Sequence, residues 1–371
     1  MITKAQSYEM KIAVSTLSDV SMNEGTSVRA KRIFELLQKE RDCTLIIRGR
    51  SPSKADNVEV IKPSKLWNFQ LIPVVRKNRF DLIYCASDFW GFFTYFALAK
   101  LYNFRIAFEA HGILSLEKED GLHNPNLLDK VAIRILKVRE KFVVRHADCI
   151  IALSSDIYKY YAKFNKRIFL IPTFVDETKF KGRESPARWK SDDDEEKTIG
   201  LIGPFAQNKG TNAYTLDFVC RNIDEFDERI KFTVIGECDF KQIRSERMQY
   251  VGYLKKFQDY VDQLTLLDAV LVASRFPTFG PLNKILEPMA CSLPVFTTSV
   301  GAVGLDHIKS GEDIFINEES ELVAQVNKSL FDFDLMDRIG RNARRTIETY
   351  YSAEANNKKL VEVIELLGTP S

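Results

Sequence analysis

Histidine is scarce and paired cysteine is missing from this sequence, and these absences exclude several common kinds of site. The chain of 371 residues contains four histidines and six cysteines. The cysteines are scattered, with no CxxC pair and no neighbouring run of histidines. Zinc sites and disulfide frameworks both need clustered ligands, so we predict neither and expect a reducing compartment.

Long apolar runs and a strong net charge are also lacking. No apolar stretch approaches the roughly 20 residues of a membrane-spanning helix. The opening residues, MITKAQSYEM, lack the apolar core of a signal peptide. The net charge is only +2, which gives the whole molecule no attraction to nucleic acid. We expect a cytoplasmic α/β protein without a nucleic-acid partner.

Two glycine-rich phosphate-binding signatures are absent as well. The sequence contains no GxxxxGK(S/T) loop, and no GxGxxG follows a strand-like run. An Asp-x-Asp spacing does occur in DDDEE at 192–196, but this polar stretch lies away from any apolar strand end. That position favours a solvated acidic loop over a metal–nucleotide site. We therefore predict no metal–nucleotide site at DDDEE.

Short apolar runs that alternate with helical stretches fill the chain instead. The runs are rich in β-branched residues and do not alternate with polar ones, which is typical of strands buried on both faces of a parallel sheet. They lie at 11–20, 42–48, 80–87, 104–112, 148–155, 167–173, 198–205, 230–237, 248–254, 269–274 and 293–299. Strands that alternate with helices predict βαβ units with right-handed crossovers.

The length of the chain indicates more than one domain, because a single core rarely serves so many residues. We predict an N-terminal Rossmann-like domain at 1–170 and a C-terminal one at 171–345, both doubly wound. A C-terminal helix at 346–371 is expected to pack back toward the N-terminal domain. Within the helical stretch that begins at residue 334, Gly340 is the expected break.

In doubly wound sheets, ligands bind beyond the carboxyl ends of the strands. Gly25 opens a helix after the first strand, where its backbone can approach a phosphate or sugar closely. His111 stands where the fourth strand ends, and its imidazole can bond a sugar hydroxyl or stabilise developing charge. A simple turn glycine and a histidine bonded to backbone are the structural alternatives.

Three further strand ends carry candidate ligands. In GPFAQNKG, Gly203 ends a strand, and Lys209 beside Gly210 at a helix start suits a diphosphate, because a cation and backbone amides meet there. Gly252 and Tyr253 end another strand, where the backbone can face a nucleobase. An ordinary core strand end is the alternative for that last pair.

The segment PLNKILEPMA predicts a helix on which Lys284 and Glu287 share one face. A carboxylate at this place can accept both hydroxyls of a ribose, while the lysine and first-turn amides face phosphate. The alternative is an exposed lysine–glutamate pair, which contributes only a few tenths of a kcal/mol.

The helix predicted at 127–146 carries six basic residues and two acidic ones. Its apolar residues recur at helical spacing. The pattern predicts either a peripheral contact with an anionic membrane or a helix whose apolar residues face the core and whose basic residues face solvent.

Five segments follow one another in a recognisable order. They are RHADCIIALSSDIYKYYAKFNKRIFLIPTFVDETKF (145–180), IGPFAQNKG (202–210), VIGECD (234–239), KILEPMACSLPVFTTSVGAVGLD (284–306) and RIGRNARRTIETYYS (338–352). Over about residues 11–365 the chain thereby resembles the family 4 retaining glycosyltransferases of the GT-B fold.

The resemblance implies two Rossmann-like domains that face each other across a cleft. It implies transfer of a sugar, with retention, from a UDP- or GDP-linked donor to a glycan, lipid or small-molecule acceptor, without a metal or a cofactor. Lys209, Gly210 and Gly203 would hold the diphosphate, and Glu287 the ribose. Catalytic roles fall to Lys209 and, from the other half, to His111 and Gly25.

The sequence departs from the family pattern at four places. Pro204 replaces the usual arginine, Phe279 replaces the first of two glutamates, and Ser292 replaces a glycine. Thr173 and Phe174 replace an Asn-Gly pair. A variant pattern, G-x-x-x-K-x-L-E, fits Gly280 to Glu287, and its lysine would compensate for the lost cation. The departures favour one alternative function, a non-catalytic nucleotide-sugar-binding subunit. A nucleotide-sugar epimerase of the same fold is the other.

Overall fold

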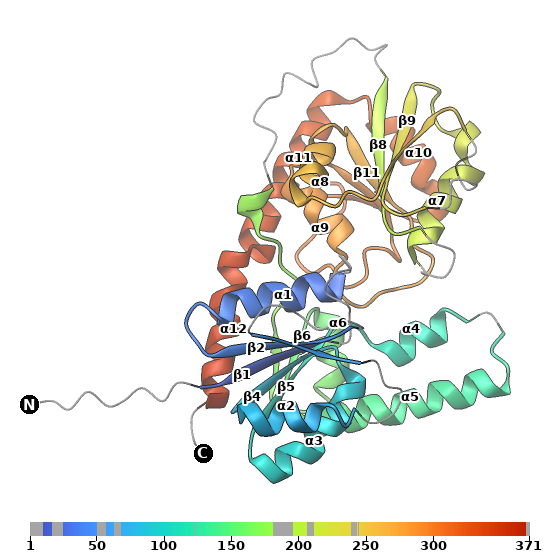
Figure 1. Ribbon diagram of the computed structural model, residues 1–371. Coiled ribbons are helices and arrows are strands. Elements are labelled where there is room, and N and C mark those ends of the chain that lie inside the picture. The colour runs from blue at the N-terminus through green and yellow to red at the C-terminus, as the bar shows by residue number, and fades with distance from the viewer. Residues whose placement is uncertain are drawn as a thin grey trace, which may run out of the picture. The chain divides into compact units, whose positions relative to one another are not determined.

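The computed structural model describes most of the chain. The described residues are 10–16, 25–49, 57–62, 68–122, 124–180, 196–205, 211–238, 243 and 245–368, without the side chains of 25–27, 90, 211 and 212. They form two compact units (Figure 1). The first consists of the described parts of Met1–Pro172 and Asn357–Ser371, and the second is Thr173–Asn356.

The first unit is a seven-stranded parallel sheet in the order β3-β2-β1-β4-β5-β6-β7. Its strands are β1 (Ile12–Thr16), β2 (Cys43–Arg48), β3 (Val58–Ile61), β4 (Leu82–Ala86), β5 (Arg105–Ala110), β6 (Cys149–Ala152) and β7 (Ile168–Leu170). Its helices are α1 (Gly25–Leu37), α2 (Leu71–Asn78), α3 (Phe89–Tyr102), α4 (Leu114–Asp120), α5 (Leu127–His146) and α6 (Ser155–Tyr161). Figure 1 shows α1 on one face of this sheet and α2 with α3 on the other.

The second unit is a six-stranded parallel sheet in the order β10-β9-β8-β11-β12-β13. Its strands are β8 (Lys197–Ile202), β9 (Ile230–Ile235), β10 (Met248–Gly252), β11 (Ala269–Val272), β12 (Val295–Thr298) and β13 (Phe315–Asn317). Its helices are α7 (Thr211–Arg221), α8 (Phe257–Thr265), α9 (Asn283–Ala290), α10 (Glu319–Ser329) and α11 (Phe333–Thr346), and α12 (Ala353–Gly368) begins in it.

Burial of the strands on both faces confirms why the apolar runs do not alternate. Along β11, Ala269 and Leu271 pack into one hydrophobic cluster, while Val270 and Val272 pack into the other. A strand between two helical layers needs apolar side chains at every position. All eleven predicted runs contain strands. The prediction of two Rossmann-like sheets is therefore confirmed, although the edge strands β3 and β13 were not predicted.

The end of α12 packs within the first unit. Arg41 Nη2 lies 2.8 Å from Glu365 Oε1, and Arg105 Nη1 donates to the Leu367 carbonyl at 2.7 Å. The first unit is thus discontinuous in sequence, with its last piece supplied from Asn357 onward. Among the helices that the structure describes, none has both the length and the apolar character needed to cross a membrane.

The prediction that Gly340 breaks the C-terminal helix is wrong. Helix α11 runs without interruption through Gly340 and ends at Thr346, and a π-helical turn, Ile347–Tyr351, follows it. Gly340 is buried, and a Cβ there would lie 2.3 Å from the Ser292 carbonyl oxygen. The glycine therefore allows close helix packing and does not end the helix.

Gly340→Ala is expected to lower the free energy of unfolding by roughly 1–3 kcal/mol, the usual cost of overpacking. On helix propensity alone the same change would raise it by up to about 1 kcal/mol, so the sign separates the two effects. Urea unfolding measures the difference. Arg341→Ala, at an exposed position of the same helix, is the control and should change stability little. A Gly340→Ala variant as stable as the wild type would contradict the packing role.

Candidate functional site

The strand order of the second unit reverses between β8 and β11, and this is where doubly wound sheets bind ligands. Beyond the carboxyl end of β8 comes Gly203, and beyond that of β11 comes the loop that leads into α9. Helix α7, which follows β8, is hydrogen-bonded to the residue after β11, since Thr215 Oγ1 donates to the Ala273 carbonyl at 2.7 Å. The candidate nucleotide site therefore lies at this edge of the sheet.

Three glycines join the carboxyl ends of β8, β9 and β10. The Gly203 amide donates to the Ile235 carbonyl at 3.0 Å, and the Gly236 amide donates to the Gly252 carbonyl at 2.8 Å. Gly236 has a φ of 126°, and a Cβ there would lie 1.5 Å from the Gly203 carbonyl oxygen. Only glycine fits at that position. Because these three residues have no side chains, backbone atoms line this part of the carboxyl edge of the sheet.

Gly252 and Tyr253 lie at the same edge, at the end of β10. Gly252 has a φ of 83°, in the left-handed region that favours glycine. Tyr253 follows it with half of its side chain exposed. Gly236 was not among the candidate residues that the sequence predicted, although its place directly after a buried strand was a signal.

The loop before α9 is held in place by a second close approach. Gly304, with a φ of 84°, is the contact point, because a Cβ there would lie 2.3 Å from the Phe279 carbonyl oxygen. Thr298 fixes the start of the same loop, since its Oγ1 accepts from the Ser274 amide at 3.0 Å and donates to the Ser274 carbonyl at 2.9 Å. Gly280 is buried in this loop, just before the helix.

Lys284, in the first turn of α9, is buried, with 8% of its surface exposed. Burial lowers the pKa of its ammonium group to about 8, because a low-dielectric surrounding disfavours the charged form. The alternative of an exposed lysine–glutamate pair is therefore wrong. A lysine buried at the amino end of a helix adds its charge to the positive end of the helix dipole.

Glu287 is half-buried one turn later, and Tyr260 of α8 orients it. The Tyr260 hydroxyl donates to Glu287 Oε2 at 3.0 Å. Burial and the Glu287 charge raise the pKa of Tyr260 well above its usual value, so the hydroxyl keeps its proton and remains a donor. The carboxylate is thus held in a fixed place. Lys209 and Gly210 lie outside the described residues.

In the first unit, Glu109 positions His111, and sequence reasoning missed this glutamate. Glu109 lies in β5 and His111 follows the strand, so the E-x-H spacing puts both side chains on one side of the extended chain. Glu109 Oε1 lies 2.5 Å from His111 Nε2. The spacing itself was the signal, and Gly25 is the first residue of α1 in the same unit.

Glu109 is completely buried, and two further groups bind it. Arg29 of α1 contacts Oε2 through Nε and Nη2, both at 2.7 Å, and the Tyr84 hydroxyl donates to the same oxygen at 2.5 Å. Burial alone would raise the pKa of Glu109, but Arg29 and His111 outweigh it and lower the pKa to about 2. The carboxylate is therefore ionised across the physiological range.

An ionised carboxylate can only accept hydrogen bonds, so His111 Nε2 must carry a proton and donate. The tautomer is fixed as a result, and Nδ1 is the ring atom left for other contacts. This arrangement gives the histidine a set orientation and a counter-charge. The structural alternative, a histidine at a strand end that bonds only to backbone, is therefore wrong for His111.

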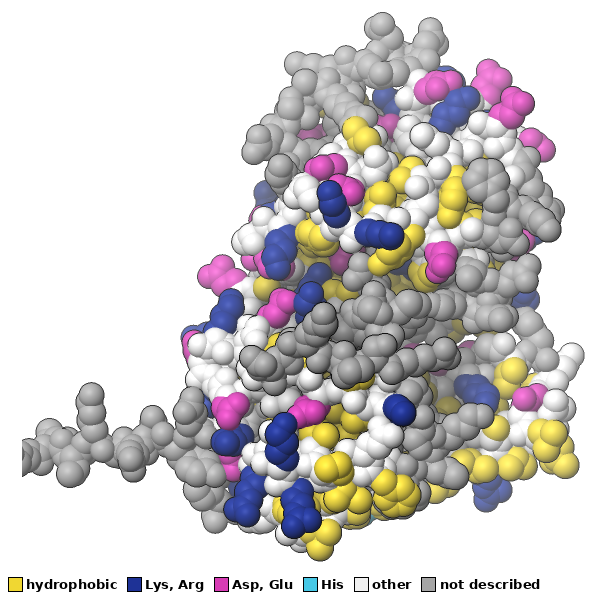
Figure 2. Space-filling view, viewed as in Figure 1, with side chains coloured by type: hydrophobic (Ala, Val, Ile, Leu, Met, Phe, Trp, Pro, Cys, Tyr) yellow, Lys and Arg dark blue, Asp and Glu magenta, His cyan; other side chains and the backbone are white. Residues whose placement is uncertain are grey.

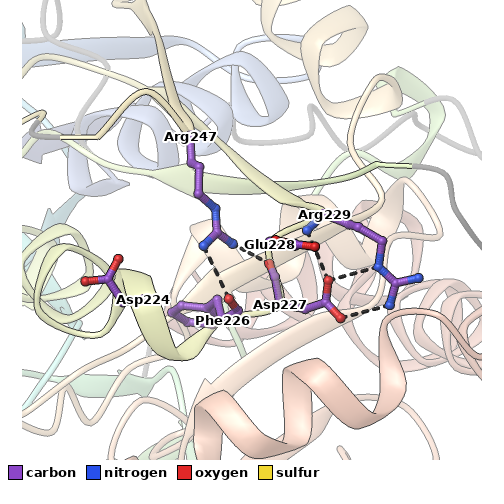
Figure 3. Close-up of a pocket in the computed structure, with 6 residues that line it drawn as sticks. All are labelled: Asp224, Phe226, Asp227, Glu228, Arg229 and Arg247. Carbon is purple, nitrogen blue, oxygen red and sulfur yellow. Dashed lines mark hydrogen bonds and ion pairs between the residues drawn. The ribbon is translucent and has the colours of Figure 1, made fainter.

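A pocket on the second unit lies elsewhere and has a structural explanation. It is lined by Asp224, Phe226, Asp227, Glu228, Arg229 and Arg247 (Figure 3). These residues precede β9 and β10, at the amino ends of the strands. Arg247 donates to the carbonyls of Ile223 at 2.9 Å and Ile230 at 3.0 Å, which makes it a clamp on the backbone.

Two family models match the chain in succession. Residues 32–179 match the domain described as Glycosyltransferase Family 4, and residues 196–332 match the domain described as Glycosyl transferases group 1. The chain therefore combines two glycosyltransferase domains in the GT-B fold.

Particular relatives agree with this class. The chain is 26% identical over 167 residues to the capsular polysaccharide biosynthesis glycosyltransferase CapM of Staphylococcus aureus, and that match covers 42% of each protein. The fold is similar to that of HepE from Anabaena in complex with UDP and glucose, with a TM-score of 0.72 and 17% identity over 96% of this chain and 100% of that one. Sucrose-phosphate synthase from Thermosynechococcus elongatus gives a TM-score of 0.74 and 16% identity, over 97% and 99% of the two chains.

Proposed function

We propose that this protein transfers a sugar from a nucleotide-diphosphate donor to a glycan, lipid or small-molecule acceptor, with retention at the anomeric carbon. The observation that carries the proposal is the start of α9, where Lys284 is buried and Tyr260 holds Glu287. Such a buried cation suits a diphosphate, and a fixed carboxylate suits the two hydroxyls of a ribose.

Our proposal for the base and sugar of the donor is supported by solved structures with a similar fold and by the carboxyl edge of the second sheet. HepE is described in complexes with UDP and with UDP-glucose, which supports a UDP-linked donor, and a GDP-linked donor is the other candidate. Gly252 and Tyr253 lie at the strand end where the base would contact backbone. CapM is named for capsular polysaccharide biosynthesis, and this supports a glycan acceptor.

The proposed chemistry is stabilisation of charge. The departing diphosphate gains negative charge as the bond to the sugar breaks, and preorganised cations and amides lower the energy of that state. Lys284 would act there with Lys209, Gly210 and Gly203, so we propose a transfer without a metal or cofactor. His111, positioned by Glu109, would contact the sugar, and Gly25 would let backbone approach it.

Glu287→Gln is expected to weaken UDP binding about tenfold, because a neutral amide accepts ribose hydroxyls less strongly than a carboxylate. Titration calorimetry measures the affinity, and release of UDP from UDP-sugars in the presence of glycan acceptors measures transfer. Glu321→Ala removes an exposed carboxylate from α10 and serves as the matched control. Unchanged affinity in the Glu287→Gln variant would contradict the ribose assignment.

The products of the same assay separate the alternatives. Binding of UDP or GDP with no turnover would support the non-catalytic subunit that Pro204 and Phe279 favour. Conversion of one nucleotide sugar into another without an acceptor would support an epimerase. Either result would overturn sugar transfer.

A further inference from the structure

The exposed face of α5 has an arrangement of side chains that the sugar-transfer proposal does not use. This 20-residue helix presents five large apolar side chains to solvent, with exposed fractions from 48% for Val131 to 79% for Leu128. The five are Leu127, Leu128, Val131, Ile135 and Val138. The alternative of a core-facing helix with a basic solvent face is therefore only partly right. Helix α5 packs on the core through the apolar residues Ile133, Val143 and Val144, but its solvent face carries these five apolar residues as well.

The apolar residues form one continuous stripe. At about 100° per residue, Leu127, Leu128, Val131, Ile135 and Val138 fall within a sector of roughly 100° on one side of the helix. Figure 2 shows hydrophobic side chains gathered at the lower right of the molecule, where α5 runs in Figure 1. We call this set the α5 stripe.

A row of basic residues runs beside the α5 stripe along the same exposed face. At the same angular spacing, the row occupies the sector next to the stripe. Its members are Lys130, Arg134, Lys137, Lys141 and Arg145. Lys137 also forms an ion pair with Glu119 of α4 at 2.6 Å. Half of the exposed face is thus apolar and half is basic.

Both acidic residues of α5 lie away from this face. Glu140 is buried and accepts from the Ser115 amide at 3.1 Å. Asp129 is half-buried and closes the capping box with Asn126. The two acids therefore serve internal contacts, and α5 itself brings no negative charge to its exposed face.

We propose that the α5 face rests on the surface of an anionic lipid bilayer. An apolar stripe with a basic border is what an interfacial helix needs, because the stripe enters the boundary between headgroups and acyl chains while the cations contact lipid phosphates. Lysine and arginine stems are long enough to keep their charge at the headgroups while the helix sinks in. A protein partner is less suited, because lysine is depleted at the centre of such interfaces.

Co-sedimentation with vesicles tests the proposal. The full chain should bind vesicles of mixed phosphatidylglycerol and phosphatidylcholine and bind pure phosphatidylcholine at least tenfold more weakly, and added salt should reduce the binding. The double variant Lys130→Gln/Arg134→Gln should bind anionic vesicles about 30-fold more weakly, since each basic residue near such a surface contributes about fivefold. Leu128→Gln/Ile135→Gln should lose binding by at least tenfold, through lost apolar burial.

Leu266→Gln is the matched control, because Leu266 is an exposed leucine of the second unit and should leave binding unchanged. All substituted side chains are exposed, so the thermal midpoints should stay close to that of the wild type. Failure of the wild type to bind anionic vesicles would overturn the proposal. Binding that the α5 variants leave intact, or binding of an acidic polypeptide without binding of vesicles, would overturn it as well.

Discussion

Glu109→Gln is expected to reduce sugar transfer by about a hundredfold, within the range that a positioned acid–base group contributes. The change removes the counter-charge and frees the choice of tautomer at His111, because an amide can either accept from or donate to Nε2. Initial rates of UDP release at saturating donor measure the loss. His111→Gln leaves the Arg29–Glu109 pair in place and should cause a similar loss.

The two changes should not add, because both remove the same oriented imidazole. A double variant that is no worse than either single variant is therefore expected. Additive losses would mean that Glu109 acts independently of His111. Asp313→Asn is the control for a general loss of packing, because Asp313 is a buried carboxylate of the second unit. This change should leave the transfer rate unchanged.

The free energy of unfolding of the Glu109→Gln variant provides a second test of the ionised pair. Glutamine leaves Arg29 buried without its partner charge, which costs about 3–5 kcal/mol. The pKa of Glu109 is lowered from 4.5 to about 2, so its contribution is fully present above pH 4.5 and is lost as the pH falls through 2. The gap in unfolding free energy between wild type and variant should therefore narrow below pH 4.5. A gap that stays constant from pH 7 to 3 would contradict the ionised pair.

Lys284→Met is expected to weaken UDP binding by about a hundredfold and to stabilise the protein without ligand. The pKa of this lysine is lowered by burial from 10.5 to about 8, so its charge opposes folding below pH 8 and ceases to do so above pH 10.5. The shift corresponds to about 3 kcal/mol, which methionine would recover at pH 7. Urea unfolding at pH 7 and pH 10 should show the gain shrinking with rising pH.

Binding should also show this titration. A bound diphosphate would favour the charged lysine, so UDP binding near pH 8 should take up protons and weaken as the pH rises further. Titration calorimetry in two buffers of different ionisation enthalpy measures the uptake. Lys328→Met, at an exposed lysine of α10, is the control and should behave as the wild type. Equal proton uptake by the wild type and by Lys284→Met would contradict the assignment of Lys284 as a ligand of the diphosphate.

The fold was predictable because each buried strand needs apolar residues on both faces, and that requirement is visible in the sequence. The edge strands β3 and β13 were missed, because they are short and only partly buried. Gly340 was misread because a glycine that permits close packing looks in sequence like one that ends a helix. The apolar residues of α5 were read as either core-facing or membrane-facing, and periodicity alone does not distinguish these.

The candidate site was predictable only in part. Gly203 and Gly252 do follow strands, as expected, since topology fixes where strands end. The burial of Lys284 and the pairing of Glu109 with Arg29 depend on segments far apart in sequence. Neither can be read from local spacing. The roles of Lys209 and of the other candidate residues stay predictions.

The discontinuity of the first unit sets the order in which the two units are completed during synthesis. Residues from Asn357 onward belong to that unit, and their contacts with Arg41 and Arg105 join them to its earlier part. The ribosome makes these residues only after it has made the whole second unit. The first unit therefore stays incomplete while the second is produced whole, and premature termination anywhere in the second unit leaves both unfinished.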